Sequence, residues 1–169
     1  ADRVALDIGA STGGFTDCLL QRGAKKVYAI DVGHNQLAMK LRQDPRVESY
    51  EGTHARDLAS IQFSEMPSLV VIDVSFIGLR KILPAIVSVL VAPFEVVALV
   101  KPQFELEPEY VKKGGVVSCP NDQQLAVSLV REFIKEELGL EVRGVMPAPL
   151  RGEKSGNQEF FLFFKAEGE

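Results

Sequence analysis

Cysteine is scarce in this sequence, and no segment has the pattern of a secretion signal or a membrane span. The two cysteines, Cys18 and Cys119, are too few and too far apart to predict a disulfide framework or a zinc site, which favours a protein of the reducing cytoplasm. The N-terminus lacks the basic start and apolar stretch of a secretion signal. The longest apolar region, residues 83–100, contains two prolines and a glutamate, so we expect a helix, a turn and a buried strand there.

An excess of positive charge is also missing. The 19 basic and 23 acidic residues give a formal net charge of −4, which excludes a protein whose whole surface binds nucleic acid but leaves room for a local basic patch. Apolar residues make up 46% of the chain and charged residues 25%, as is typical of a globular protein. A length of 169 residues is enough for one domain over residues 1–169 with a sizeable core.

Apolar runs alternate with helical patterns along the chain. We expect strands at 3–8, 26–30, 46–50, 68–73, 95–101, 140–146 and 159–165, and helices at 15–21, 36–43, 80–91 and 122–138. The final two strands are joined by a loop without a helix, which is the connection of antiparallel neighbours. The pattern predicts an α/β fold: a doubly wound, mostly parallel seven-stranded sheet with an antiparallel last strand.

A glycine-rich turn, residues 9–14 (GASTGG), joins the first expected strand to the first expected helix. Ligands bind at such turns, outside the carboxyl ends of the strands. Gly9 and Gly14 match the outer glycines of the dinucleotide fingerprint, but Ser11 replaces the middle glycine that lets the backbone approach a pyrophosphate. The turn therefore favours S-adenosylmethionine, which has no phosphate, over a nicotinamide cofactor.

Three aspartates follow the first three expected strands or end them. We expect Asp7 to face the ammonium group of the cofactor, Asp31 to accept both ribose hydroxyls and Asp57 to accept from the adenine amino group. An unpaired carboxylate after an apolar run is costly, which favours a functional role for Asp7. The alternatives are that the glycines only allow close packing of helix on strand, and that Asp57 caps a turn.

The motifs of the whole chain resemble those of a known family. Residues 7–17 (DIGASTGGFTD), 29–33 (AIDVG) and 36–37 (QL) are similar to the cofactor motifs of TlyA-type, or hemolysin-A-like, RNA methyltransferases, which belong to the FtsJ-like ribose 2′-O-methyltransferases. The similarity continues through residues 73–77 (DVSFI), 99–105 (LVKPQFE), 113–117 (KGGVV) and 155–161 (SGNQEFF). It implies a Rossmann-like methyltransferase fold, S-adenosylmethionine as cofactor and a ribose 2′-hydroxyl of ribosomal RNA as substrate. The candidate cofactor-binding residues are Asp7, Gly9, Ala10, Ser11, Gly13, Gly14, Phe15, Asp31, Val32 and Asp57.

Three ionisable residues lie at the ends of separate expected strands. Asp73 and Lys101 end the fourth and fifth strands, and Glu159 begins the antiparallel last strand, so we expect the three to meet at one edge of the sheet. Singly, each also fits an ordinary cap or surface charge. The resemblance implies a catalytic tetrad of Lys, Asp, Lys and Glu, of which these are the last three. The first lysine would lie upstream of residue 1, so we expect a fragment that binds the cofactor but turns over poorly.

Basic residues in the expected loops are candidates for RNA phosphate contacts, although each is equally well explained as a solvated loop charge: Arg80, Lys81, Lys112, Lys113, Arg151 and Lys154. Residues 105–109 (ELEPE) are more acidic than expected beside RNA. The resemblance implies an upstream RNA-binding domain and ribosomal RNA or ribosomal subunits as partners. Two alternatives stay open: a cofactor-binding module without catalysis, and a membrane-active protein of the kind that the hemolysin label describes.

Overall fold

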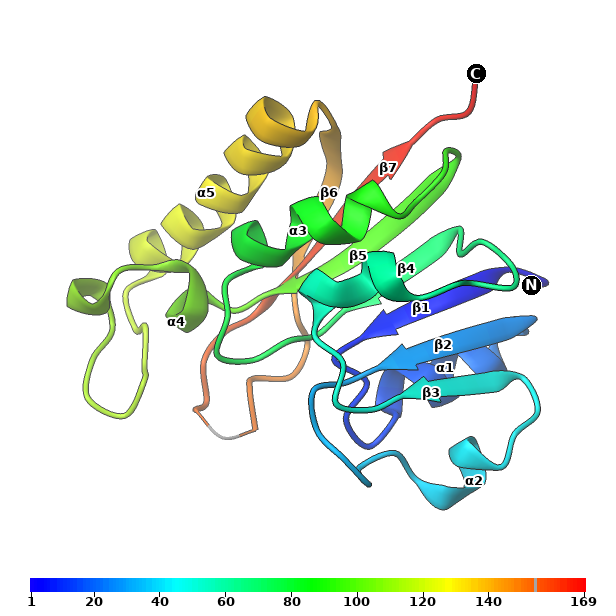
Figure 1. Ribbon diagram of the computed structural model, residues 1–169. Coiled ribbons are helices and arrows are strands. Elements are labelled where there is room, and N and C mark those ends of the chain that lie inside the picture. The colour runs from blue at the N-terminus through cyan, green and yellow to red at the C-terminus, as the bar shows by residue number, and fades with distance from the viewer. Residues whose placement is uncertain (154) are drawn as a thin grey trace. The chain divides into compact units, whose positions relative to one another are not determined.

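The computed structural model describes residues 1–153 and 155–169, and these form a seven-stranded sheet with the order β3-β2-β1-β4-β5-β7-β6 (Figure 1). β1 runs parallel to β2 and β4, β2 runs parallel to β3, and β7 runs antiparallel to β6. The predicted fold class is therefore confirmed. The strands are β1 (Val4–Ile8), β2 (Lys26–Ile30), β3 (Val47–Tyr50), β4 (Leu69–Ile72), β5 (Phe94–Val100), β6 (Glu141–Pro147) and β7 (Phe160–Ala166).

The helices follow the predicted pattern with two corrections. They are α1 (Gly14–Gln21), α2 (Met39–Arg42), α3 (Leu79–Ser88), α4 (Pro102–Glu105) and α5 (Pro120–Leu138), with 3₁₀ turns η1 (Ala55–Ser60) and η2 (Pro108–Tyr110). The helix expected at 36–43 is wrong in its first half, because Ala38 has an extended backbone and donates its N–H to the Thr12 carbonyl at 3.0 Å. The helix expected at 80–91 ends at Ser88, where the last N–H groups bond three residues back instead of four.

The chain divides into two compact units, 1–73 with 82–96 and 166–169, and 74–81 with 97–165. In the first unit, β1 is buried along its length, and α1 lies on one face of β1 and β2 (Figure 1). In the second unit, α5 runs beside β6 and buries Val127, Val130 and Ile134. The expectation of a single domain stays a prediction.

The longest apolar region forms the expected helix, turn and strand. Residues 83–100 contain the second half of α3, a turn and β5, and Leu83, Ile86 and Val96 are fully buried. No helix within residues 1–153 and 155–169 is both long enough and apolar enough to cross a bilayer. The apolar character of this region is therefore used for packing in the core.

Candidate active site

The glycine-rich turn is held in left-handed backbone conformations by contacts to β2. The φ angles are 83° at Gly9, 52° at Ser11 and 101° at Gly13. The N–H groups of Gly9 and Ala10 both donate to the carbonyl of Ile30, at 2.9 and 3.0 Å. Ser11 is exposed and adopts a conformation that glycine adopts more easily, so the middle position of the fingerprint has glycine-like geometry without a glycine.

Glycine is required at position 13 because the turn passes close to the core. A Cβ there would lie 2.2 Å from Leu41 Cδ1 and 2.7 Å from Leu37 Cδ1. Both leucines are buried, so little room exists to move them. Gly14 is the first residue of α1, and an added Cβ would meet nothing within 4 Å. Close packing therefore requires glycine at position 13 and not at position 14, but the neighbours are Leu37 and a residue of α2, not a strand.

Asp31 joins the turn to the end of β2. Its Oδ2 accepts the Ser11 N–H at 2.7 Å, and its Oδ1 accepts the Gly33 N–H at 2.7 Å. Two backbone donors therefore order the carboxylate, and each oxygen keeps a lone pair for a ligand. A small hollow, partly open to solvent, lies beside this carboxylate. It is lined by Ala10, Ser11, Ala29, Asp31, Gly33, Gln36, Leu37, Ser49 and Glu51.

Asp7 lies beneath the turn with no exposed surface. The hydroxyl of Thr16 donates to Oδ2 at 2.7 Å, whereas Oδ1 has no hydrogen-bond partner. Burial raises the pKa of Asp7 to about 6, against the hydrogen bond from Thr16, and the negative charges of Asp73 and Asp31 raise it further. Asp7 does not line the hollow, but an unpartnered buried carboxylate oxygen is what a cationic group would stabilise.

Asp73 lies beside the same turn. It directly follows β4, and its N–H donates to the carbonyl of Ile8 at 2.9 Å, at the end of β1. Its carboxylate is close enough to raise the pKa of Asp7. The first unit therefore gathers Asp7, Asp31 and Asp73 around one glycine-rich turn.

The other predicted cofactor residues lie in different surroundings. Phe15 is half-buried in the first turn of α1, and Val32 is exposed directly after Asp31. Asp57 is exposed within η1 and does not line the hollow. Its contact with the adenine amino group stays a prediction.

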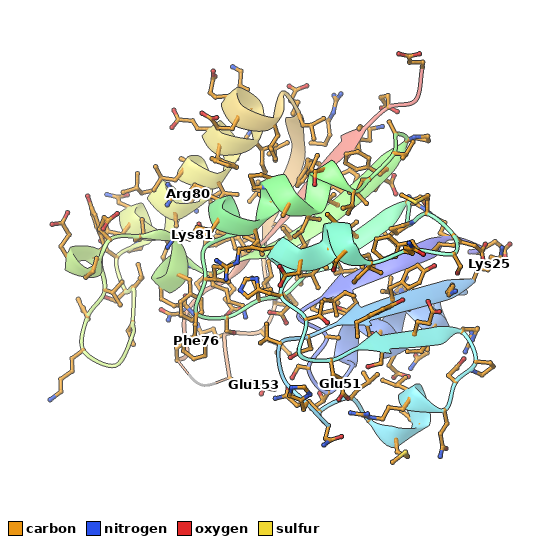
Figure 2. All side chains as sticks on the ribbon, in the orientation of Figure 1. Lys25, Glu51, Phe76, Arg80, Lys81 and Glu153 are labelled. Carbon is orange, nitrogen blue, oxygen red and sulfur yellow. The ribbon has the colours of Figure 1, made fainter. Side chains whose placement is uncertain are left out.

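Ser49 and Glu51 line the hollow although they lie outside every predicted cofactor motif, and Gln36, from the 36–37 motif, lines it with them. Glu51 directly follows β3 and projects at that end of the strand (Figure 2). The backbone N–H of Asn35 holds the pKa of Glu51 below its usual range, and the Arg42 guanidinium, with which Glu51 forms an ion pair, lowers it further. The same rule that identified Asp31, an acid directly after a parallel strand, identifies Glu51.

The second unit contains Lys101 and Glu159. Lys101 directly follows β5, and its Nζ donates to Ser75 Oγ at 3.1 Å. Glu159 directly precedes β7 and is only 9% exposed. A Cβ at Gly152 would lie 2.8 Å from Glu159 Oε1, so the glycine lets the loop pass close to this carboxylate. The meeting of Asp73, Lys101 and Glu159 at one edge stays a prediction.

Asn157 holds the segment that leads into Glu159. It is buried; its Oδ1 accepts the Val117 N–H at 2.9 Å, and its Nδ2 donates to the Gly115 carbonyl at 2.8 Å. These bonds fix Asn157 to the hairpin that Lys112 and Val116 close. The Asn157 side chain thus forms hydrogen bonds with the Val117 N–H and the Gly115 carbonyl, which lie outside the named helices and strands. Its role is therefore structural.

The candidate phosphate contacts differ in exposure. Lys81, Lys112, Lys113 and Arg151 are exposed, whereas Arg80 is half-buried against Glu105. Lys154 lies outside the described residues. Within the part of the chain that the structure describes, no three His, Cys, Asp or Glu side chains are grouped as a metal site, and Cys18 and Cys119 are unbridged.

Comparison with known proteins gives a consistent picture. The model of the FtsJ-like methyltransferase family matches residues 1–166. The 16S/23S rRNA (cytidine-2′-O)-methyltransferase TlyA of Mycobacterium tuberculosis H37Rv is 47% identical over 167 residues, which cover 99% of this chain and 62% of that protein. Hemolysin A of Brachyspira hyodysenteriae is 46% identical over 166 residues, 96% of this chain and 68% of that protein. A solved structure named "Putative hemolysin from Streptococcus thermophilus" is 44% identical with a TM-score of 0.92, and the match covers 99% of this chain and 60% of that one. The chain thus spans about three fifths to two thirds of the length of these relatives.

Proposed function

The chain belongs to the FtsJ-like methyltransferase family, and we propose that it transfers a methyl group from S-adenosylmethionine to a ribose 2′-hydroxyl of ribosomal RNA. The mycobacterial relative is named for this chemistry on cytidines of 16S and 23S rRNA. The observation that carries the proposal for this chain is the carboxylate of Asp31, ordered by two backbone N–H groups beside the hollow. We expect the protein to act in the cytoplasm.

The residues around the hollow fit S-adenosylmethionine. Asp31 would accept hydrogen bonds from the ribose hydroxyls, and the unpartnered Oδ1 of Asp7 would accept from an ammonium group. Ser11 stands where a glycine would let the backbone approach a pyrophosphate. S-adenosylmethionine has no pyrophosphate, so it does not need that glycine. The cofactor supplies an electrophilic methyl group on a sulfonium sulfur. A sulfonium is already reactive, so the work left to the protein is alignment and removal of one proton.

Asp73, Lys101 and Glu159 would act on the 2′-hydroxyl. Lys101 would lower the pKa of the hydroxyl as a nearby cation, or accept its proton when neutral. The two carboxylates would hold the amine in place. The sheet order supports this arrangement, since β4, β5 and β7 are consecutive strands and the three residues directly follow or precede them.

RNA phosphates would contact the exposed basic side chains of Lys81, Lys112, Lys113 and Arg151. These contacts supply position and not sequence choice. The net charge of −4 indicates that this chain alone holds RNA weakly. The match covers 62% of the mycobacterial protein, and further RNA contacts would come from chain outside the matched part.

Two measurements test the proposal. Calorimetry should show binding of S-adenosylmethionine and no binding of NAD. Incubation of the full-length protein with ribosomal subunits and methyl-labelled cofactor should place the label on a ribose 2′-oxygen. Binding of NAD alone, or label on a base, contradicts the proposal. Cofactor binding without any transfer identifies a binding module instead, and leakage of dye from liposomes would support the membrane-active alternative.

A further inference from the structure

One face of α4 contacts the segment that connects β4 to α3. Phe104 and Glu105 belong to α4, and Lys101 is the extended residue that directly precedes its first turn. Each contacts a different point of the connecting segment. Lys101 Nζ donates to Ser75 Oγ at 3.1 Å, the rings of Phe104 and Phe76 lie 5.3 Å apart between centroids, and Glu105 Oε1 accepts the Leu79 N–H at 2.6 Å.

Glu105 is the buried end of this row of contacts. It is 5% exposed, and the N–H it accepts belongs to the first residue of α3, where a negative charge is favoured by the helix dipole. Arg80 Nε lies 3.6 Å from Glu105 Oε2, and Arg80 Nη2 donates to the Glu105 carbonyl at 2.5 Å. Burial raises the pKa of Glu105, and the Leu79 N–H and the Arg80 charge oppose that effect.

The connecting segment fits closely against Glu105. A Cβ at Gly78 would lie 2.9 Å from the Phe104 carbonyl oxygen and 3.2 Å from Glu105 Oε2, so only glycine allows this approach. Figure 2 shows Phe76 and Arg80 at the two ends of the same short stretch. Contacts to α4 therefore hold the segment on both sides of Gly78, at Phe76 and at Leu79.

This conformation of the connecting segment is strained. Phe76 has a φ angle of 64° and is 85% exposed, which is unusual for a bulky residue. Such a backbone conformation persists only where neighbouring contacts impose it. The contacts on this segment are the Phe104 ring at Phe76 and the buried Glu105 carboxylate at Leu79.

We propose that Glu105 is a positioning residue for methyl transfer: by holding Gly78 and Leu79, it keeps the Ser75 hydroxyl within hydrogen-bonding distance of the Lys101 amine. The inference rests on the proposed function, since Lys101 is the residue assigned to the 2′-hydroxyl. Glu105 itself is buried beneath the connecting segment and touches no reactant. Its effect reaches the reaction through the position of Ser75.

The test compares Glu105→Gln with Glu107→Gln in the full-length protein. Glutamine replaces the charged acceptor of the Leu79 N–H with a weaker neutral one and removes the ion pair with Arg80, so the hold on Gly78 and Leu79 is loosened. Glu107 is exposed two residues further on. For Glu105→Gln we expect kcat for methyl transfer to fall about 10- to 100-fold, as misplacement of a reacting group by about 1 Å does. The KM for S-adenosylmethionine should stay unchanged, because the candidate cofactor residues lie in the other unit. Glu107→Gln should match the wild type in both.

A second readout needs no methyl transfer. The amine of Lys101 is labelled with an amine-reactive reagent at fixed pH, with the exposed Lys113 as internal reference, and quantified by mass spectrometry. Loss of one hydrogen bond of about 1 kcal/mol should increase the relative labelling of Lys101 about fivefold in Glu105→Gln. If the wild type transfers no methyl group to any RNA, the proposed function fails, and the labelling still decides whether Glu105 positions Ser75.

Ser75→Ala keeps the test decisive if Glu105→Gln does not fold. Ser75 is exposed, so its replacement should leave the thermal unfolding midpoint unchanged while reproducing the loss of kcat and the faster labelling of Lys101. A Glu105→Gln protein with wild-type kcat and wild-type labelling but a lower unfolding midpoint shows a purely structural role and overturns the proposal. Wild-type kcat and labelling in Ser75→Ala overturn it equally.

Discussion

The backbone N–H of Ser11 donates to Oδ2 of Asp31 at 2.7 Å, although 20 residues separate the two along the chain. This bond joins the glycine-rich turn to the end of β2 and orders the Asp31 carboxylate before any ligand arrives. A side chain that is already ordered loses little entropy on binding. Ser11 adopts a φ angle of 52° to make this bond, which places a left-handed residue where a dinucleotide-binding protein has glycine.

Asp31→Asn should weaken binding of S-adenosylmethionine. The variant keeps the size of the side chain but loses its charge and one acceptor oxygen, and hydrogen bonds to charged groups contribute about 1.5–3 kcal/mol, so we expect the Kd to rise about 10- to 100-fold. Calorimetry measures it. Asp44→Asn is the matched control, because Asp44 is a half-buried residue of the same unit that pairs with Arg46 and does not line the hollow. An unchanged Kd in Asp31→Asn would remove Asp31 from the site.

Asp7→Asn should remove a pH dependence of stability. The folded state raises the pKa of Asp7 from 3.8 to about 6, so folding is favoured by this group at pH below 3.8, and that contribution is lost as the pH rises through about 6. A shift of this size corresponds to about 3 kcal/mol of unfolding free energy. Urea unfolding of both proteins from pH 4 to pH 7.5 checks this.

The unfolding free energy of the wild type should decline relative to that of Asp7→Asn as the pH rises from 4 through about 6. Above that pH the two curves should run parallel. Asp44→Asn again serves as control. Arg46 lowers the pKa of Asp44 to about 2, so this carboxylate is ionised in the folded protein throughout the interval. The unfolding free energy of the wild type should therefore show no such decline relative to that of Asp44→Asn. Parallel curves for the wild type and Asp7→Asn would show that Asp7 is not a buried charge.

The two adjacent glycines of the turn should respond to alanine in opposite directions. Gly13→Ala forces a Cβ to within 2.2 Å of Leu41 at a φ angle of 101°, and we expect it to destabilise the protein. Strain and overpacking of this kind cost about 1–3 kcal/mol each. Gly14→Ala meets open space at the start of α1 and should stabilise by up to about 1 kcal/mol. Urea unfolding of the pair decides it, and equal effects of the two substitutions would contradict the observed turn.

The alternation of apolar runs and helical patterns was sufficient to predict the sheet, because a parallel strand buried on both faces and an amphipathic helix have different periods. The end of β2 and its acid, Asp31, followed from the same pattern. The first half of the helix expected at 36–43 did not form, since the Thr12 carbonyl takes the N–H of Ala38. That competition between a local helix and a distant turn is a tertiary effect, invisible in the local sequence.

Two acidic residues show what local reasoning misses. Glu51 directly follows β3 and lines the hollow, whereas the predicted Asp57 is exposed in η1 and does not line it. The sequence 105–109 predicts an acidic loop, whereas Glu105 is buried against the first residue of α3. A charged residue is rarely buried without partners, and its partners here, Leu79 and Arg80, come from a segment 25 or more residues earlier.

The most direct test of the account is the rate of methyl transfer by Lys101→Met, which keeps the length of the side chain and removes its amine. The full-length wild type and variant are each incubated with ribosomal subunits and S-adenosylmethionine, and 2′-O-methylated nucleosides are quantified by mass spectrometry. We predict that kcat falls by about 100-fold or more, as for the loss of a general acid–base group, while the Kd for S-adenosylmethionine is unchanged. Transfer by Lys101→Met at the wild-type rate would contradict the account.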